Sequence, residues 1–209
     1  TGTGRAFCAG LDLNEAASGE GIGTGGKFAA TLDLRNTPPT VLHAIDKPVI
    51  AALNGSAAGY GMDLALGCDI RIMAEEAKLA AAFVKRGVVP ESGGTWFLPR
   101  MLGWAKASEI IFTGRTLSAA ECLAEGLANV VVPADQVQAE ARRMAAEIAA
   151  NAPLAVTSAK RMMRMGLEET FPTHVQHVYL QLLPLFASDD FQEGIRSFLE
   201  KRPAQFTGR

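Results

Sequence analysis

The sequence predicts an α/β fold in its first half and a helical second half. An apolar run at residues 48–53 leads through a glycine-rich turn into an apolar helical segment, which is the order strand, turn, helix. Beyond residue 134, long segments rich in alanine and leucine are separated by prolines, which end helices. The 209 residues are enough for one sizeable hydrophobic core and a smaller helical part.

Residues 48–69 contain the most informative motif. The apolar run from Pro48 to Leu53 predicts a buried strand, small residues and glycines then predict a tight turn, and the residues after Gly61 predict a buried helix. Glycine has no Cβ, so such a turn lets another backbone or a ligand approach closely. The N–H groups at a helix start are unpaired, which favours a site for an anion or a developing oxyanion. The dinucleotide fingerprint is incomplete because its third glycine is missing, and a turn needed only for packing is the alternative.

The segment before this motif contains a second strand-like piece. Residues 4–13 (GRAFCAGLDL) form this piece, which ends in Ala9-Gly10, and residues 11–14 are expected to begin a short helix. Five glycines within residues 19–26 predict a flexible surface loop. Residues 28–45 are expected to form a helix interrupted at Pro38-Pro39.

The remaining elements follow from periodicity and from capping signals. Ser118 with Glu121 three residues later is a capping box, which predicts a helix start. Ile70 and Ile72 alternate with polar Asp69 and Arg71, which supports a strand over residues 68–74. The other expected elements, in chain order, are an extended piece at 77–83, a loop at 84–94, helices at 95–102 and 104–112, a helix from 118 to 126, a strand at 130–133, and helices at 135–151, 154–165, 171–186 and 189–199.

Composition and charge exclude several classes of protein. The chain is 48% hydrophobic and 20% charged, which is typical of a globular protein, and no apolar run reaches membrane-spanning length. A net charge of -2 argues against a nucleic-acid partner. The three cysteines are far apart and outside any C-x-x-C motif, so we expect small buried residues in a reducing cytoplasm. We expect no metal site, and His174 and His177 are interpreted as part of a polar helix face.

Four motifs, in chain order, are "GRAFCAGLDL", "NGSAAGYGMDLALGCDI", "VVPESGGTWFLPRMLG" and the final "FLEKRPAQF", and together they span nearly the whole chain. In this order they resemble the crotonase superfamily, the enoyl-CoA hydratase/isomerase enzymes. The resemblance implies a ββα spiral core over residues 1–133 and a C-terminal helical trimerisation region over residues 134–209. It also implies a few dozen further residues before the first motif. The expected partners are an acyl-CoA thioester and further copies of the chain, in a homotrimer or hexamer, with no cofactor because coenzyme A is part of the substrate.

Enolate formation from a thioester needs donors aimed at the thioester oxygen and a base at the carbon. By resemblance, the donors are the backbone N–H groups of Leu11 and Tyr60, which follow or lie within the two glycine turns. The residues expected to contact the substrate are Ala9, Gly10, Gly59, Gly61, Phe83 and Lys201, the last by holding the coenzyme A nucleotide.

Two carboxylates are the candidate catalytic residues, Asp63 and Glu91. Asp63 occupies the position of the first hydratase glutamate, but its side chain is one methylene shorter. The second hydratase position falls on Phe83, which has no proton to transfer. Glu91 in "VPESGGTW" matches the acid position of double-bond isomerases, and we expect it to be buried in the acyl pocket. One well-placed acid favours a proton shuttle between two carbons over activation of water by a pair.

Other functions stay open. A non-catalytic acyl-CoA-binding protein is the main alternative, and Phe83 favours it. Thioester hydrolysis and dehalogenation are further reactions of the superfamily. A serine hydrolase is disfavoured because Ser92 lies in no G-x-S-x-G motif.

Overall fold

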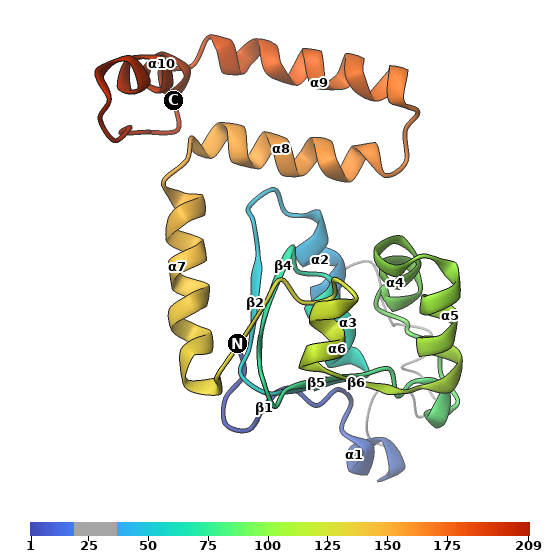
Figure 1. Ribbon diagram of the computed structural model, residues 1–209. Coiled ribbons are helices and arrows are strands. Elements are labelled where there is room, and N and C mark those ends of the chain that lie inside the picture. The colour runs from blue at the N-terminus through green and yellow to red at the C-terminus, as the bar shows by residue number, and fades with distance from the viewer. Residues whose placement is uncertain (19–36) are drawn as a thin grey trace. The chain divides into compact units, whose positions relative to one another are not determined.

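The structure is a computed structural model that describes residues 1–18 and 37–209 (Figure 1). The predicted glycine-rich loop lies outside the described residues, as do residues 28–36 of the expected helix. The chain forms two compact units. The first consists of residues 1–44 and 49–141, and the second of residues 45–48 and 142–209.

The first unit contains two β-sheets. One sheet has the strand order β1-β3-β5-β6, in which the first three strands are parallel and β6 is antiparallel to β5. The other sheet, β2-β4-β7, is wholly parallel. The strands are β1 (Ala6–Cys8), β2 (Ile50–Leu53), β3 (Ser56–Ala58), β4 (Ile70–Ala74), β5 (Lys78–Ala80), β6 (Thr116–Ser118) and β7 (Val130–Val132).

The chain winds through these two sheets as a repeated ββα unit. Strand β2 joins one sheet, β3 joins the other, and α3 (Tyr60–Leu66) follows. Strands β4 and β5 repeat this order and lead to α4 (Gly94–Leu102) and α5 (Trp104–Thr113). After β6 comes α6 (Ala119–Ala124), and β7 then pairs with β4 in the sheet β2-β4-β7. This order confirms the predicted ββα spiral core.

Three local expectations in the first unit are corrected. Residues 56–58 form a strand rather than only a turn, because small side chains fit a central strand between β1 and β5. Residues 116–118 form β6, although Ser118 still caps α6 through the predicted capping box. Pro38 and Pro39 begin helix α2 (Pro38–Ala44) instead of interrupting one, since the first turn of a helix does not need the missing N–H groups.

Arg71 of the predicted strand β4 is buried, with only 5% of the residue exposed. Its guanidinium donates hydrogen bonds to the carbonyl groups of Ala65, Cys68 and Leu127. Two of these carbonyls lie at the C-terminal end of α3, where the helix dipole favours a cation. Burial lowers the pKa of Arg71. The side chain therefore ties β4 to α3 within the core.

The core of the first unit is aliphatic and lies between the sheets and their helices. Its largest fully buried side chains are Leu53, Met62, Leu66, Ile72, Met73, Leu79, Leu98, Ile110, Leu117, Leu127 and Val137. Most of the short strands and helices that carry these side chains are predicted from apolar runs in the sequence. The remaining elements of this unit are α1 (Leu13–Ser18) and the 3-10 turns η2 (Val84–Arg86) and η3 (Ala134–Gln136).

The second unit is helical, as predicted. It contains most of α7 (Val137–Ala149) together with α8 (Pro153–Gly166), α9 (Phe171–Phe186) and α10 (Asp189–Glu200). Helices α8 and α9 pack against each other. Asp46 forms ion pairs with Arg161 and Arg164 of α8, which anchor residues 45–48 to this unit. No helix in residues 1–18 and 37–209 is long and apolar enough to cross a membrane.

The tail after α10 folds back onto that helix. Arg202 forms ion pairs with Glu193 and Glu200. Asp190, which is 3% exposed, accepts hydrogen bonds from the N–H groups of Thr207 and Gly208 at 2.6 and 2.9 Å. These contacts fix the chain end as part of the second unit.

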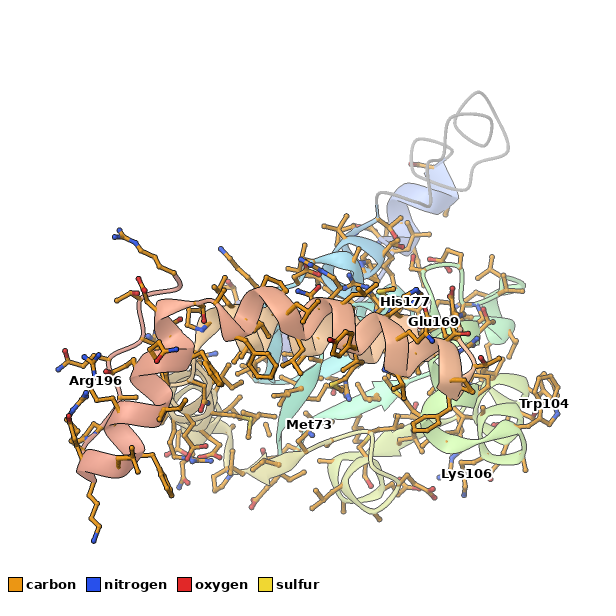
Figure 2. All side chains as sticks on the ribbon, turned by 90° about the horizontal axis from the view of Figure 1, so that it is seen from above. Met73, Trp104, Lys106, Glu169, His177 and Arg196 are labelled. Atoms are coloured by element: carbon orange, nitrogen blue, oxygen red, sulfur yellow. The ribbon has the colours of Figure 1, made fainter. Side chains whose placement is uncertain are left out.

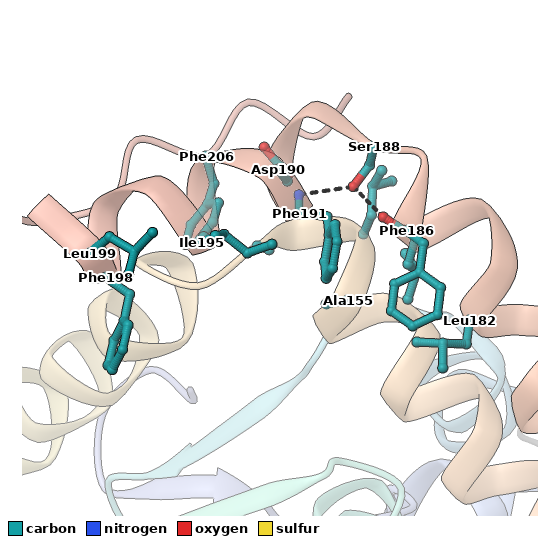
Figure 3. Close-up of a pocket in the computed structure, with 14 residues that line it drawn as sticks. Ala155, Leu182, Phe186, Ser188, Asp190, Phe191, Ile195, Phe198, Leu199 and Phe206 are labelled. Carbon is teal, nitrogen blue, oxygen red and sulfur yellow. Dashed lines mark hydrogen bonds between the residues drawn. The ribbon is translucent and has the colours of Figure 1, made fainter.

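An apolar groove lies beside α10 in this unit (Figure 3). Its volume is about 540 Å³, and Phe186 and Phe191 meet in it edge to face at a centroid distance of 5.0 Å. Phe198 and Leu199 line the groove and are exposed, and Leu180 and Leu183 of α9 are exposed apolar residues of the same unit. Such a surface is larger than single helices usually leave in water.

Candidate active site

The two glycine motifs meet because their strands are neighbours. Strands β1 and β3 pair in parallel, with Cys8 opposite Ala57. Gly10 has a φ of 86°, and a Cβ there would lie 2.6 Å from the Ala58 oxygen and 3.5 Å from the Tyr60 nitrogen. A Cβ at Gly61 would overlap the backbone of Cys8. Glycine is therefore required at both positions to bring the turns into contact.

The backbone N–H groups predicted to hold an oxyanion belong to these two turns. Tyr60 is the first residue of α3, and its N–H lies close to Gly10, next to Leu11 in the chain. The Leu11 side chain is 44% exposed, so it is not part of the core. The position of Leu11 is consistent with a role of its amide, which stays a prediction.

Asp63 lies one helical turn after Tyr60 and is completely buried. Its Oδ2 accepts a hydrogen bond of 3.1 Å from the N–H of Ser92, whereas Oδ1 has no hydrogen-bond partner among the described residues. Burial raises the pKa of Asp63 to about 7, the N–H groups of Gly94 and Ser92 oppose this rise, and the charge of Glu91 adds to it. A carboxyl with this pKa changes its protonation near neutral pH.

Glu91 belongs to the loop that closes over Asp63. The expectation that Glu91 is buried is wrong, because the residue is exposed in this chain. The next residue, Ser92, is 3% exposed, and its N–H holds Asp63. The loop thus places one acid inside the protein and the other at the surface of the same site.

The phenol of Tyr60 is a third titratable group that interacts electrostatically with Asp63 and Glu91. Burial raises the pKa of its phenol, and the nearby charges of Cys8, Glu91 and Asp63 raise it further. The residue is half-buried. A phenol with a raised pKa stays neutral and keeps its proton for donation.

The other residues predicted to contact the substrate have different surroundings. Phe83 is 4% exposed and lies immediately before the 3-10 turn η2. Gly59 has a φ of 54° at the turn before α3, and Ala9 is exposed beside Gly10. Lys201 ends α10 in the second unit, is exposed and has a φ of 53°. Their contacts with a substrate stay predictions.

The histidines are engaged in structural contacts. His43 packs edge-on against Trp96 and Phe97 at ring distances of 5.1 and 5.2 Å. His174 and His177 both form hydrogen bonds with Glu169, and Figure 2 shows the pair Glu169 and His177. In the part of the chain that the structure describes, no cluster of histidine, cysteine and acidic residues could hold a metal ion.

Sequence reasoning missed the support that the loop gives to Asp63. Ser92 was weighed only as a nucleophile, yet its backbone N–H is the group that contacts the acid. A Cβ at Gly94 would overlap Asp63 Oδ1 and lie 2.8 Å from the Pro90 Cβ. The Gly93-Gly94 pair was the available signal, because adjacent glycines often mark a close approach of backbone to another group.

Comparisons with known proteins agree with this architecture. Residues 1–209 match the family described as Enoyl-CoA hydratase/isomerase. The chain is 40% identical to the carnitinyl-CoA dehydratase of Proteus mirabilis and 36% identical to the 2,3-dehydroadipyl-CoA hydratase of Escherichia coli, covering all of this chain and 80% of each relative. It is also similar to the crystal structure of enoyl-CoA hydratase from Bacillus anthracis, with a TM-score of 0.92 and 37% identity over all of this chain and 80% of that one. The chain belongs to the enoyl-CoA hydratase/isomerase family.

Proposed function

We propose that this protein binds an enoyl-CoA and moves its double bond through a thioester enolate. The observation that carries the proposal is the pair of acids beside the two joined glycine turns, with Glu91 exposed and Asp63 completely buried. The amides of Leu11 and Tyr60 hold the enolate oxygen. Preorganised donors of this kind stabilise charge that develops in the transition state.

In this mechanism Glu91 carries the proton. A group that transfers a proton must reach the reacting carbon, and a fully buried carboxylate cannot do so while the loop covers it. Asp63 instead positions the loop by accepting the Ser92 N–H. Glu91 takes a proton from one carbon and returns it to another, so no second acid is required at the position of Phe83.

Hydration of the double bond is the second candidate reaction. Its support is that relatives carry the names hydratase and dehydratase, and that Asp63 occupies the first hydratase position with a pKa of about 7. In that reaction a loop movement would expose Asp63 to a water molecule. A non-catalytic acyl-CoA-binding protein is the outcome if neither reaction occurs.

The test is product analysis with 2-enoyl-CoA and 3-enoyl-CoA thioesters of several chain lengths in deuterated water. Isomerisation by one shuttling acid predicts interconversion of the two substrates with incomplete incorporation of solvent deuterium at carbon and no 3-hydroxyacyl-CoA. Hydroxylated product would establish hydration, free coenzyme A would establish hydrolysis, and binding without turnover would refute a catalytic role.

Replacement of the acids separates the two mechanisms. Glu91→Gln keeps the shape of the side chain and removes the base, so turnover should fall by roughly 10²- to 10⁴-fold with little loss of binding. Asp63→Asn should cost much less. Glu76→Gln, at an exposed glutamate in the turn between β4 and β5, is the control and should leave turnover unchanged. The opposite ranking, with Asp63 essential and Glu91 dispensable, would replace this mechanism by hydration through Asp63.

A further inference from the structure

The hydroxyl of Ser92 has no part in the mechanism described so far, which uses only the backbone N–H of this residue. Ser92 contacts both acids of the site. Its N–H donates a hydrogen bond of 3.1 Å to Asp63 Oδ2, and its hydroxyl oxygen lies 3.5 Å from Glu91 Oε1. An ionised carboxylate can only accept hydrogen bonds, so the hydroxyl is the donor in the second contact. One residue therefore connects the buried acid to the exposed acid.

The backbone on both sides of Ser92 fixes the position of this hydroxyl. Ser92 is only 3% exposed, and Pro90, whose ring restricts the backbone, is buried two residues earlier. On the other side, the Gly93 oxygen accepts hydrogen bonds of 2.8 Å from the N–H groups of Trp96 and Phe97 at the start of α4. The serine oxygen is one rotatable bond from the backbone. The hydroxyl is therefore a donor with little freedom to move.

Glu91 has the opposite properties. The residue is exposed, and three rotatable bonds separate its carboxylate from the backbone, so an unsupported carboxylate would occupy several rotamers. A hydrogen bond to a charged acceptor is among the stronger protein hydrogen bonds and can select one of them. Hydrogen bonds of catalytic groups are often long without substrate and shorten in the complex. A separation of 3.5 Å suits a contact that tightens when substrate excludes water from the carboxylate.

We propose that Ser92 is a positioning residue, whose hydroxyl holds the Glu91 carboxylate in the rotamer that faces the substrate. The N–H of the same residue ties the loop to Asp63 of α3, the helix that begins at Tyr60. The base is thereby fixed relative to the amide that holds the enolate oxygen. The proposal rests on the proposed role of Glu91 as the base.

The first test compares kcat and KM for an enoyl-CoA. Ser92→Ala removes the hydroxyl and keeps the N–H that binds Asp63, so kcat should fall by roughly 5- to 30-fold, as expected for one lost hydrogen bond. KM should change little, because the hydroxyl acts on the substrate only through Glu91. A parent value of kcat, or a change in KM alone, would overturn the proposal.

Thr95→Val is the matched control. The Thr95 hydroxyl also makes a 3.5 Å hydrogen bond, in this case to the Pro90 carbonyl oxygen, and it touches neither acid. Its removal should leave kcat and KM unchanged. A loss equal to that of Ser92→Ala would show that any lost hydroxyl in this region has the same effect, which would overturn the specific role of Ser92.

The second test combines Ser92→Ala with Glu91→Gln, measured in single turnovers with excess protein. If the hydroxyl acts through the carboxylate, its removal should cost nothing more once the carboxylate is absent. A merely structural hydroxyl would cause the same loss of turnover with and without Glu91, because the two effects would then be independent. Equal losses in both backgrounds would overturn the proposal.

Crystal structures of the parent protein and of Ser92→Ala test the contact without activity. We expect one Glu91 rotamer within hydrogen-bond distance of Ser92 Oγ in the parent and several rotamers in the variant. An unchanged single rotamer in the variant would overturn the proposal.

The outcomes separate this proposal from the proposed function. If Glu91→Gln strongly lowers turnover while Ser92→Ala keeps the parent kcat, the positioning role is wrong and the base assignment stands. If Glu91→Gln is fully active, the base assignment is wrong, and the positioning role fails with it.

Discussion

Replacing Asp63 by asparagine should stabilise the protein at alkaline pH. The pKa of Asp63 rises from 3.8 to about 7 on folding, which is roughly three pH units. At about 1.36 kcal/mol per unit, the ionised side chain costs the folded state about 4 kcal/mol. Between pH 4 and 7 the folded state binds the extra proton, so its stability falls as the pH rises and is constant again above that range. Asparagine has no such proton, so it should recover about 1–4 kcal/mol at pH 8, and this gain should disappear near pH 4.

The assay is denaturant unfolding at pH 8 and pH 4 with fixed protein concentration, because association would otherwise shift the midpoints. Asp190→Asn is the matched control. Asp190 is also buried, but its carboxylate accepts two N–H hydrogen bonds. Asparagine can accept only one of them well, so this variant should lose about 1–3 kcal/mol at pH 8. The reasoning would be refuted if Asp63→Asn destabilised the protein at pH 8 as Asp190→Asn does, or if its gain were equal at both pH values.

Three further predictions concern the loop, the tail and assembly. Gly94→Ala would place a Cβ against Asp63 Oδ1 and the Pro90 side chain, so it should lower the free energy of unfolding by about 1–3 kcal/mol and lower turnover. Thermal unfolding and steady-state kinetics measure these two effects. Unchanged stability and unchanged turnover would show that the loop adapts freely to the added methyl group. Lys201→Ala should raise KM for acyl-CoA at low salt by removal of a cation that faces phosphates, and an unchanged KM would contradict this role. Light scattering at micromolar concentration should give a homotrimer or hexamer, since Leu180 is 61% and Phe198 82% exposed in the single chain; a monomer would contradict this prediction.

Much of the fold follows from local sequence signals. The capping box at Ser118 and Pro153 at the start of α8 mark helix starts without reference to any other part of the chain. Helix α9 has the same bounds in the sequence prediction and in the structure, residues 171–186. The short strand β3 was missed, because Ser-Ala-Ala carries no strand signal of its own. Its pairing with β1 and β5 makes it a strand, and pairing is a property of distant residues.

The residue types of the candidate site were also available from the sequence, namely two glycine turns and two acids. The sequence did not determine which acid is buried. Glu91 was expected inside and is exposed, whereas Asp63 was expected to be a minor contributor and is completely buried with a pKa of about 7. Burial depends on how the loop around Ser92 and Gly94 closes over α3. A contact between segments that are distant in the chain cannot be predicted from the local sequence of either segment. Desolvation is set by everything that surrounds a group, so only the tertiary structure decided the environment of these acids and of the Tyr60 phenol beside them.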